Sequence, residues 1–234
     1  MHCFRYDDLA ECHAGSVVRL DKEENGHLFK TLRAAPGDHT LLMDGNGLLA
    51  EAEVIPGKEL VICSIEKKQL PAAPFLHMYI APPRRQKMDQ ILRQATELGV
   101  YRIIPMISER SVSLPDQDSV NGRWKEILFD ACKQSGNPYL PQVSEPIRFA
   151  DALKDAQENC ERRFFGSVAE CPPNEEKEKV LHAAWFVGPE GGFTREEEQQ
   201  LLDSGVEPLH FGNWILRVET AAVCGLALIH SNLK

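Results

Sequence analysis

Alternating apolar and polar positions indicate that the first third of the chain is rich in β-strands. Within residues 48–54, apolar side chains alternate with glutamates, which is the period of a strand with one buried face. A Gly-Asn-Gly turn separates this segment from an expected strand over residues 40–44, and an apolar run over 60–65 predicts another. A short helix is expected over 26–33. Together these elements predict a small β-rich domain over residues 1–70.

A linker is expected next, because residues 67–74 combine polar side chains with two prolines between apolar runs. Beyond it, apolar runs of strand length occur at residues 76–81, 102–107, 163–166, 184–188 and 209–212. Segments with helical spacing or a helix-start signal occur at residues 86–98, 124–131, 194–205 and 221–230. This alternation predicts an α/β domain with a largely parallel sheet over residues 75–234.

Composition narrows the function classes. The 234 residues include 26 basic and 35 acidic side chains, a formal net charge of -9. That balance disfavours a protein that coats nucleic acid non-specifically, since such binding is largely phosphate neutralisation. The seven cysteines form no Cys-x-x-Cys pair and the eight histidines show no zinc-helix spacing, so we expect reduced thiols and no metal. No membrane-spanning or export segment is visible, and we expect a cytoplasmic protein.

The densest candidate site is the glycine-rich loop over residues 186–194, which joins a buried strand to a helix with a capping-box signal. Glycines let a ligand approach backbone groups closely, and the start of a helix offers unpaired N–H donors. The loop lacks the Gly-x-Gly-x-x-Gly pattern of dinucleotide sites and the Lys-Ser/Thr of a P-loop. A nicotinamide enzyme or a nucleotidase is therefore disfavoured. A purely structural turn is the alternative interpretation.

A second candidate site lies at residues 211–222, where a strand ends at a glycine and an apolar loop leads into the last helix. Arg217 stands between apolar residues there, so we expect it to have an anionic partner. Glu219 and Thr220 suit the beginning of a helix, and capping explains them as well as chemistry does. Residues 84–110 form a third candidate: six basic and three acidic side chains that either contact phosphates or are simply solvated.

Taken together, these segments resemble the bacterial small-subunit (16S) ribosomal RNA uridine-N3 methyltransferase family of the SPOUT superfamily, and the resemblance covers nearly the whole chain. In the first part it depends on His27–Arg33, Pro36-Gly37 and Leu42–Gly45. In the second part it depends on Lys87-Met88, Thr96–Val100, Ser108–Arg110, Ala131–Gly136, Leu140-Pro141, Gly188–Gly192 and Leu216–Ala221. The combination is specific to the family, although each piece alone is not.

The resemblance implies a trefoil-knotted α/β domain that binds S-adenosylmethionine, acts as a homodimer and is preceded by a PUA-like β-barrel that binds RNA. It implies methyl transfer to N3 of a uridine in small-subunit ribosomal RNA, without a metal. The implied cofactor-binding residues are Phe165, Gly166, Val187, Gly188, Pro189, Glu190, Gly191, Gly192, Phe211, Gly212, Ile215, Leu216, Thr220 and Ala221. As a mechanistic hypothesis, we expect Arg217 to stabilise negative charge on the uracil oxygens or to fix a nearby phosphate. We expect Glu219 to assist removal of the N3 proton, with helix capping as the alternative. The candidates for contact with the ribosomal RNA are Arg5, Arg33, Arg84, Arg85, Lys87 and Arg110.

Three positions depart from the family pattern. Val218 stands where the family usually has threonine, and Trp214 and Asn137 stand where basic residues are common. Two other functions are also compatible with the sequence: a SPOUT methyltransferase that acts on a different RNA base or on tRNA, and a non-catalytic RNA-binding protein. Binding of the cofactor at the glycine-rich loop would separate an enzyme from a binding protein.

Overall fold

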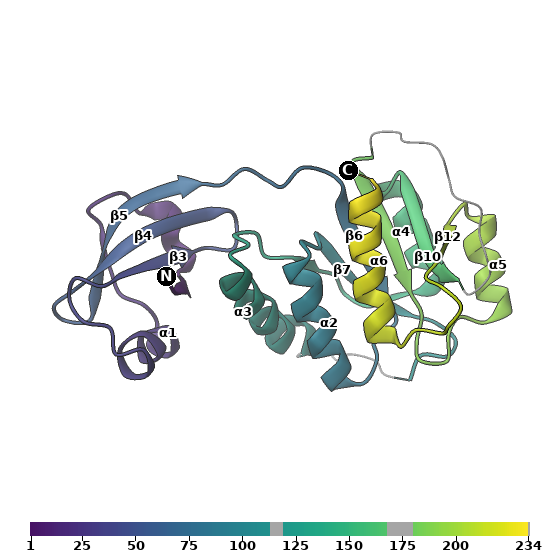
Figure 1. Ribbon diagram of the computed structural model, residues 1–234, viewed down its shortest axis with the longest axis horizontal. Helices are drawn as coiled ribbons and strands as arrows, with labels where there is room; N and C mark the ends of the chain where they lie inside the picture. Colours follow the sequence, from purple (N-terminus) through teal and green to yellow (C-terminus); the bar gives the residue numbers. More distant parts are fainter. Residues whose placement is uncertain (113–118, 168–179, 234) are drawn as a thin grey trace. The chain divides into compact units, whose positions relative to one another are not determined.

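The computed structural model describes residues 1–112, 119–167 and 180–233. The chain divides into two compact units, and Figure 1 labels their helices and strands. The first unit combines Met1–Pro71 with Phe129–Leu140, and the second combines Ala72–Leu128 with Pro141–Lys234. Cys171, for which a reduced thiol is expected, lies outside the described residues, and so does the acidic segment 172–179.

Five strands form one sheet in the first unit. They are β1 (Cys3–Arg5), β2 (Val17–Val18), β3 (His39–Met43), β4 (Leu48–Ile55) and β5 (Glu59–Lys67), in the order β1-β3-β4-β5-β2. β1 pairs parallel with β3, and the other neighbours pair antiparallel. Ala50, Ala52 and Val54 of β4 are buried, whereas Glu51 and Glu53 are partly exposed. The alternating pattern of this strand is therefore confirmed.

The helical part of the first unit begins earlier than the sequence pattern predicts. It consists of a 3₁₀-helix at Asp7–Glu11, α1 (Lys22–Gly26) and a π-helix at His27–Thr31. The expected helix over 26–33 starts too late because Asp21 caps α1. The Asp21 carboxylate accepts hydrogen bonds from the backbone N–H groups of Glu23 and Glu24.

Residues 129–140 pack within the first unit although they come much later in the chain. They comprise most of α3 (Lys125–Ser135) and the turn that follows it. Phe129 and Cys132 share a buried cluster with Met43 of β3, and Lys133 Nζ lies 2.7 Å from Glu24 Oε1. A domain boundary placed at one point in the sequence cannot predict that a later segment packs in the earlier unit.

The second unit is built on a sheet of seven strands. They are β6 (Phe75–Ile80), β7 (Arg102–Ile107), β8 (Gln142–Val143), β9 (Ile147–Arg148), β10 (Arg162–Ser167), β11 (His182–Val187) and β12 (Glu207–His210). Their order is β12-β10-β11-β6-β7-β8, with β9 paired to β7, and each of these pairings is parallel. The predicted α/β architecture with a parallel sheet is therefore confirmed.

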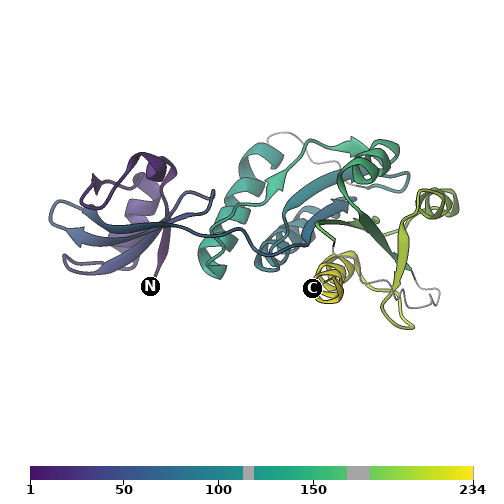
Figure 2. The ribbon, with the colours of Figure 1, turned by 90° about the horizontal axis from the view of Figure 1, so that it is seen from above.

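Helices cover both faces of this sheet. They include α2 (Arg85–Glu97), α4 (Phe149–Asn159), α5 (Arg195–Asp203) and α6 (Val218–Asn232). α2 and α6 lie side by side, and α6 packs on β6 and β11 (Figures 1 and 2). On the other face, residues of α4 and α5 join a core cluster with Ala184 and Phe186 of β11. Trp185, between them in the strand, faces Gly225 of α6. Successive side chains of β11 therefore point to opposite faces of the sheet and pack against both layers of helices.

A cluster of polar and aromatic side chains lies near the N-terminal ends of β6 and β11. His77 Nε2 is 2.9 Å from His182 Nδ1. Arg102 forms an ion pair with Asp155 at 3.0 Å, and the Tyr79 hydroxyl donates to the same carboxylate at 2.5 Å. Burial, and then the nearby His182 and Arg102, lower the pKa of His77 to about 4. His77 is therefore neutral near pH 7.

Candidate functional site

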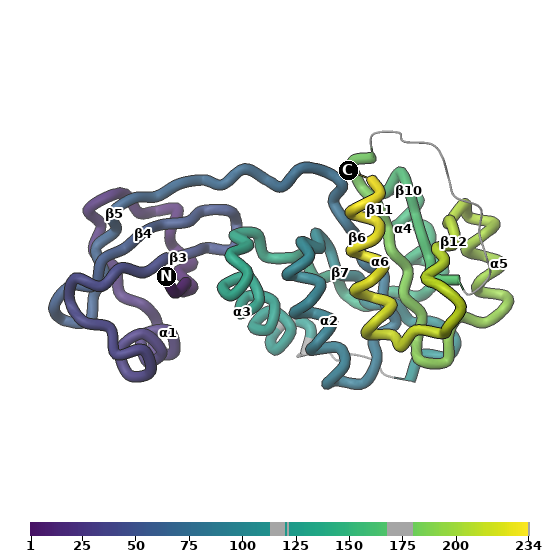
Figure 3. The backbone as a smooth tube through the Cα atoms, in the orientation of Figure 1, coloured from purple at the N-terminus to yellow at the C-terminus, as the bar shows by residue number. Residues whose placement is uncertain are grey.

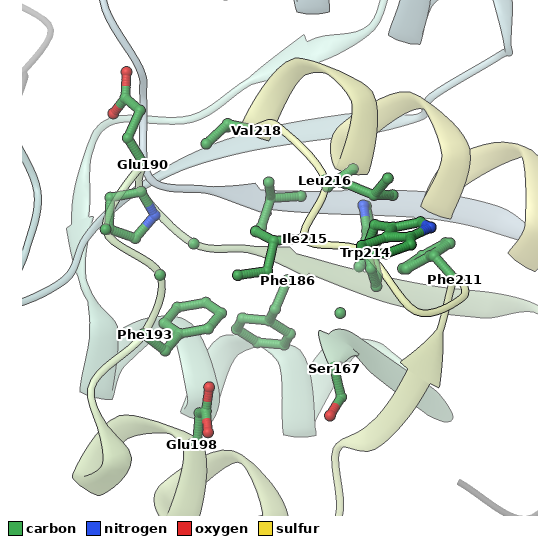
Figure 4. Close-up of a pocket in the computed structure, with 18 of the residues that line it drawn as sticks. Ser167, Phe186, Glu190, Phe193, Glu198, Phe211, Trp214, Ile215, Leu216 and Val218 are labelled. Atoms are coloured by element: carbon green, nitrogen blue, oxygen red, sulfur yellow. The ribbon is translucent and has the colours of Figure 1, made fainter. Parts of the chain in front are cut away.

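The C-terminal end of β10, the loops that follow β11 and β12, and the first turn of α6 form a pocket of about 360 Å³ (Figure 4). Glycines and apolar or aromatic side chains make up most of its lining. The lining residues are Gly166, Ser167, Trp185, Phe186, Val187, Gly188, Pro189, Glu190, Gly191, Gly192, Phe193, Glu198, Phe211, Gly212, Trp214, Ile215, Leu216, Val218 and Ala221. Ligands of parallel α/β sheets bind beyond the carboxyl ends of the strands, which is where this pocket lies.

The glycine-rich loop forms one wall of the pocket. It follows β11 and ends at Thr194, whose hydroxyl and the Glu197 carboxylate form a complete capping box at the start of α5. The predicted capping box is therefore confirmed. Gly192 has a φ of +69°, a left-handed conformation that favours glycine, and its N–H donates to Pro189 O at 2.9 Å. The loop is thus a tight turn that brings backbone groups to the pocket surface.

The segment after β7 holds this loop through hydrogen bonds. Arg110 Nη1 donates to Gly191 O at 2.8 Å and to Phe193 O at 3.3 Å. The N–H of Glu109 donates to Glu197 Oε1 at 2.8 Å, while Oε2 of this buried carboxylate completes the capping box. The sequence predicts an RNA contact for Arg110, and the structure places its guanidinium against the backbone of the glycine-rich loop.

Residues of the segment 211–216 form another wall of the pocket. This segment leads into α6, as the backbone trace in Figure 3 shows. The Phe211 ring meets the Trp185 ring edge to face, with centroids 5.6 Å apart. Trp214 and Ile215 lie on the rim and are 83% and 85% exposed. Large apolar side chains exposed at a pocket rim favour a ligand that covers them.

The last helix begins earlier than predicted, at Val218, with Arg217 in the N-cap position and no side-chain capping bond. Thr220 is exposed within the first turn and does not cap the helix, so the capping explanation of Thr220 is wrong. Arg217 is also exposed, and it has no ion-pair partner among the described residues. The expected anionic partner is absent from that part of the protein because Arg217 stands at an exposed helix start and not in the core.

Glu219, in the same first turn, lies in a different environment. Its side chain is 15% exposed, and its Oε2 is buried without a hydrogen bond from the described residues. Lys87 Nζ lies 3.5 Å from this oxygen and 3.9 Å from Glu190 Oε1 of the glycine-rich loop. Lys87, for which the sequence predicts an RNA contact, therefore lies between two carboxylates at the edge of the pocket.

Most residues expected to hold a cofactor line this pocket. They are Gly166, Val187, Gly188, Pro189, Glu190, Gly191, Gly192, Phe211, Gly212, Ile215, Leu216 and Ala221. Phe165 is instead buried in the core cluster under α4, and Thr220 is exposed. The expected cofactor-binding set does not include the lining residues Ser167, Trp185, Phe186, Phe193, Glu198, Trp214 and Val218. An apolar run in the sequence predicts a buried strand such as β11, but it does not indicate that the end of the strand lines a pocket.

The other predicted RNA contacts are distributed over the two units. In the first unit, Arg5 Nε lies 2.7 Å from Asp7 Oδ1, and Arg33 is exposed with a left-handed φ of +57°. In the second, Arg84 and Arg85 are exposed at the start of α2. Arg84 and Arg85 form no side-chain hydrogen bond or ion pair within the described chain, which leaves both guanidinium groups available to a partner.

The three departures from the family pattern have different surroundings. Val218 is buried and lines the pocket, whereas Trp214 is exposed on its rim. Asn137 lies in the turn after α3, where its Oδ1 accepts a hydrogen bond from the N–H of Tyr139 at 3.0 Å. Asn137 therefore has a local structural function in the first unit.

Other classes of site find no support in the part of the chain that the structure describes. No group of three or more His, Cys, Asp or Glu residues is placed there to hold a metal ion. No described helix is long and apolar enough to cross a membrane. Cys132 and Cys160 are buried free thiols, and burial raises the pKa of each to about 12. These two cysteines are therefore unreactive core residues.

Comparison with known proteins gives matches that include the residues of the pocket. A family model described as an RNA methyltransferase domain matches residues 71–230. The chain is 35% identical over 144 residues to ribosomal RNA small subunit methyltransferase E of Aquifex aeolicus, which covers 61% of the chain and 62% of that relative. It is 27% identical over 231 residues to the protein of the same name from Synechocystis, covering 94% of the chain and 74% of that relative.

A solved structure matches over nearly its full length. It is the crystal structure of a ribosomal RNA small subunit methyltransferase E from Neisseria gonorrhoeae bound to S-adenosyl methionine. The TM-score is 0.87 at 28% sequence identity, with 99% of this chain and 98% of that chain covered. Since the family model spans more than half of the sequence and includes every loop of the pocket, the chain belongs to the RNA methyltransferase domain family.

Proposed function

We propose that the protein transfers a methyl group from S-adenosylmethionine to N3 of a uridine in small-subunit ribosomal RNA. The observation that carries this proposal is the pocket formed by the end of β10 and the loops after β11 and β12 in a chain of the RNA methyltransferase family. The names of its relatives support ribosomal RNA of the small subunit as the substrate, and the similar cofactor-bound structure supports the methyl donor. The choice of uridine N3 depends on the motif resemblance.

The residues present fit this cofactor. The pocket volume falls within the range of small-molecule sites, about 300–1,000 Å³. Its aromatic and apolar walls suit an adenine ring, and the glycine-rich loop offers backbone donors and acceptors to polar groups. A Cβ on Gly166 would lie 3.4 Å from the Trp185 ring and 3.5 Å from the Phe211 ring, so a side chain there would occupy the pocket wall. When bound, S-adenosylmethionine supplies an electrophilic methyl group.

The substrate base must lose the proton on N3 to become a good nucleophile. Glu219 is the residue we assign to accept it, because its largely buried carboxylate lies beside pocket-lining Val218 and has an oxygen without a hydrogen bond from the described residues. We assign Arg217 to the substrate, where it stabilises negative charge on the uracil oxygens or holds an adjoining phosphate. Holding the base in line with the methyl group can contribute up to about 7–11 kcal/mol to lowering the barrier.

We further propose the trefoil knot for the second unit. The pocket loops after β11 and β12 and the packing of α6 back onto β6 and β11 support it, as does the similarity to the solved structure of a relative. Knots are rare enough that the connectivity of an ordinary sheet would not suggest one. A homodimer and a cytoplasmic location, where ribosomal subunits are assembled, belong to the same proposal.

For the first unit we propose a PUA-like barrel that binds RNA. Its five-stranded sheet supports this assignment. Arg5 and Arg33 would contact the RNA backbone from this unit, and Arg84 and Arg85 from the second. Restricted basic clusters of this kind can engage RNA although the whole chain is acidic.

Replacing Arg217 with alanine tests the catalytic assignment. We expect Arg217→Ala to lower kcat by about 10²–10³-fold if the guanidinium stabilises the uracil oxygens, while calorimetric cofactor binding and the unfolding temperature stay unchanged. A rise in KM for RNA at unchanged kcat would indicate the phosphate contact. Arg195→Ala, which removes an exposed arginine outside the pocket lining, is the control. Full activity of Arg217→Ala would contradict the assignment.

A further inference from the structure

Lys87 connects the two charged side chains at the pocket edge. It lies in the first turn of α2, which begins at Arg85. Its Nζ is 3.5 Å from Glu219 Oε2 at the start of α6 and 3.9 Å from Glu190 Oε1 in the glycine-rich loop. α2 and α6 pack against each other, so the ammonium is brought to this position by the core packing of the second unit.

Lys87 is the cation that lies near both carboxylates, Glu219 and Glu190. Two carboxylates share one ammonium. The Glu219 oxygen nearest to Lys87 is buried and receives no hydrogen bond from the described residues, so the ammonium at 3.5 Å is the polar partner that offsets its burial. Lys87 is itself only 36% exposed, with Glu190 at 30%. A side chain held in this way is poorly placed to pair with an RNA phosphate.

The location of the three residues links them to the chemistry. Glu190 lines the pocket, and Glu219 lies in α6 between the lining residues Val218 and Ala221. Lys87 does not line the pocket, and its ammonium faces the two carboxylates. We propose that Lys87 is a positioning residue for methyl transfer, which orients the Glu219 carboxylate and ties the glycine-rich loop to the start of α6. This inference rests on the proposed function of Glu219. It gives Lys87 an intramolecular role and not a contact with RNA.

Kinetics of four variants test this proposal: Lys87→Met, Lys87→Arg, Glu219→Gln and the double variant Lys87→Met/Glu219→Gln. We expect Lys87→Met to lower kcat by about 10²-fold, within the range of lost acid–base catalysis, with unchanged KM for RNA and unchanged salt dependence of RNA binding. Lys87→Arg should recover most of the rate because it restores the positive charge. The double variant should be no slower than Glu219→Gln, since the two residues act as one unit.

A matched control lies two residues away in the same turn. Arg85→Met removes an exposed basic side chain that we assign to RNA. It should raise KM for RNA and reduce the salt slope of binding while kcat changes little. If Lys87→Met behaves like Arg85→Met, Lys87 is an RNA contact and the proposal is wrong. Additive losses in the double variant would overturn it as well.

A separate measurement distinguishes failure of this inference from failure of the proposed function. If the unmodified protein transfers no methyl group to the subunit, the proposed function fails. The coupling of Lys87 and Glu219 is still measured by thermal unfolding of the same variants. The unfolding temperature of the double variant should then fall by less than the sum of the two single changes, whereas an additive fall would show that the ion pair does not exist.

Discussion

Trp214 offers a direct optical report on the pocket. It is 83% exposed on the rim, whereas Trp124 and Trp185 are buried. A ligand that covers the Trp214 indole transfers it from water to a less polar environment, so we expect cofactor binding to shift the protein's fluorescence emission to shorter wavelength. Trp214→Phe should lose this shift, and Trp124→Phe, which lies outside the pocket lining, should keep it. A shift that persists in Trp214→Phe would show that the rim is not covered.

At the level of single residues, sequence interpretation succeeds where the signal is local. The glycine-rich loop and the capping box at Thr194 are each contained in a few consecutive residues, and both lie where the sequence indicates. Lys87 and Arg110 contact residues far along the chain, and the basic composition of their segment favours RNA contacts instead. Which carbonyl or carboxylate a basic side chain meets depends on tertiary packing, which local sequence does not contain.

Packing of α6 against the sheet depends on Gly225. A Cβ at this position would lie 2.1 Å from Trp185 Cε2, so a methyl group forces the helix away from β11 or the indole out of its position. We expect Gly225→Ala to lower the free energy of unfolding by about 1–3 kcal/mol, as measured by urea denaturation. Cys224→Ala, at the exposed neighbouring position, should change it by no more than about 0.5 kcal/mol. Equal stability of the two variants would contradict this packing.

Among the elements, most segments with clear apolar spacing are predicted, whereas α4 and the shortest strands are not. The apolar pattern does not predict α4, although Phe149, Ala152, Leu153 and Ala156 are buried at helical spacing. Two of these four residues are alanines, whose small side chains weaken the apolar signal of this helix face. β1, β2, β8 and β9 contain two or three residues each and owe their existence to the strands that they pair with.

The stability of the whole protein is expected to depend on pH through His77. Its pKa is about 4 in the native state, below the ordinary value of 6.5, because it is buried near His182 and Arg102. The unfolded chain therefore takes up a proton between pH 6.5 and about 4 that the native protein does not. The free energy of unfolding should be highest above this window and fall as the pH drops through it.

Urea denaturation across this pH range, with His77→Gln as the comparison, measures the effect. Glutamine cannot titrate there and keeps a polar group near His182, so the variant should lose less stability on acidification than the unmodified protein. Parallel pH profiles of the two proteins would show that His77 does not contribute.

Charge at the scale of the whole molecule limits how RNA is engaged. Residues 1–74 have 8 basic and 12 acidic side chains, and residues 75–234 have 18 and 23, so both parts are acidic. An acidic surface repels phosphate wherever local basic clusters do not face it. The overall net charge of -9 therefore favours an RNA partner whose shape presents phosphates to the exposed basic side chains, such as Arg84 and Arg85.

Methyl transfer to its proposed substrate tests the central claim most directly. Small ribosomal subunits that lack the modification are incubated with the protein and methyl-labelled S-adenosylmethionine, and the RNA is digested and analysed by mass spectrometry. The account predicts label in small-subunit ribosomal RNA, on N3 of a uridine. Label on another base or in tRNA would contradict the substrate, and no transfer in the presence of measured cofactor binding would contradict the proposed activity.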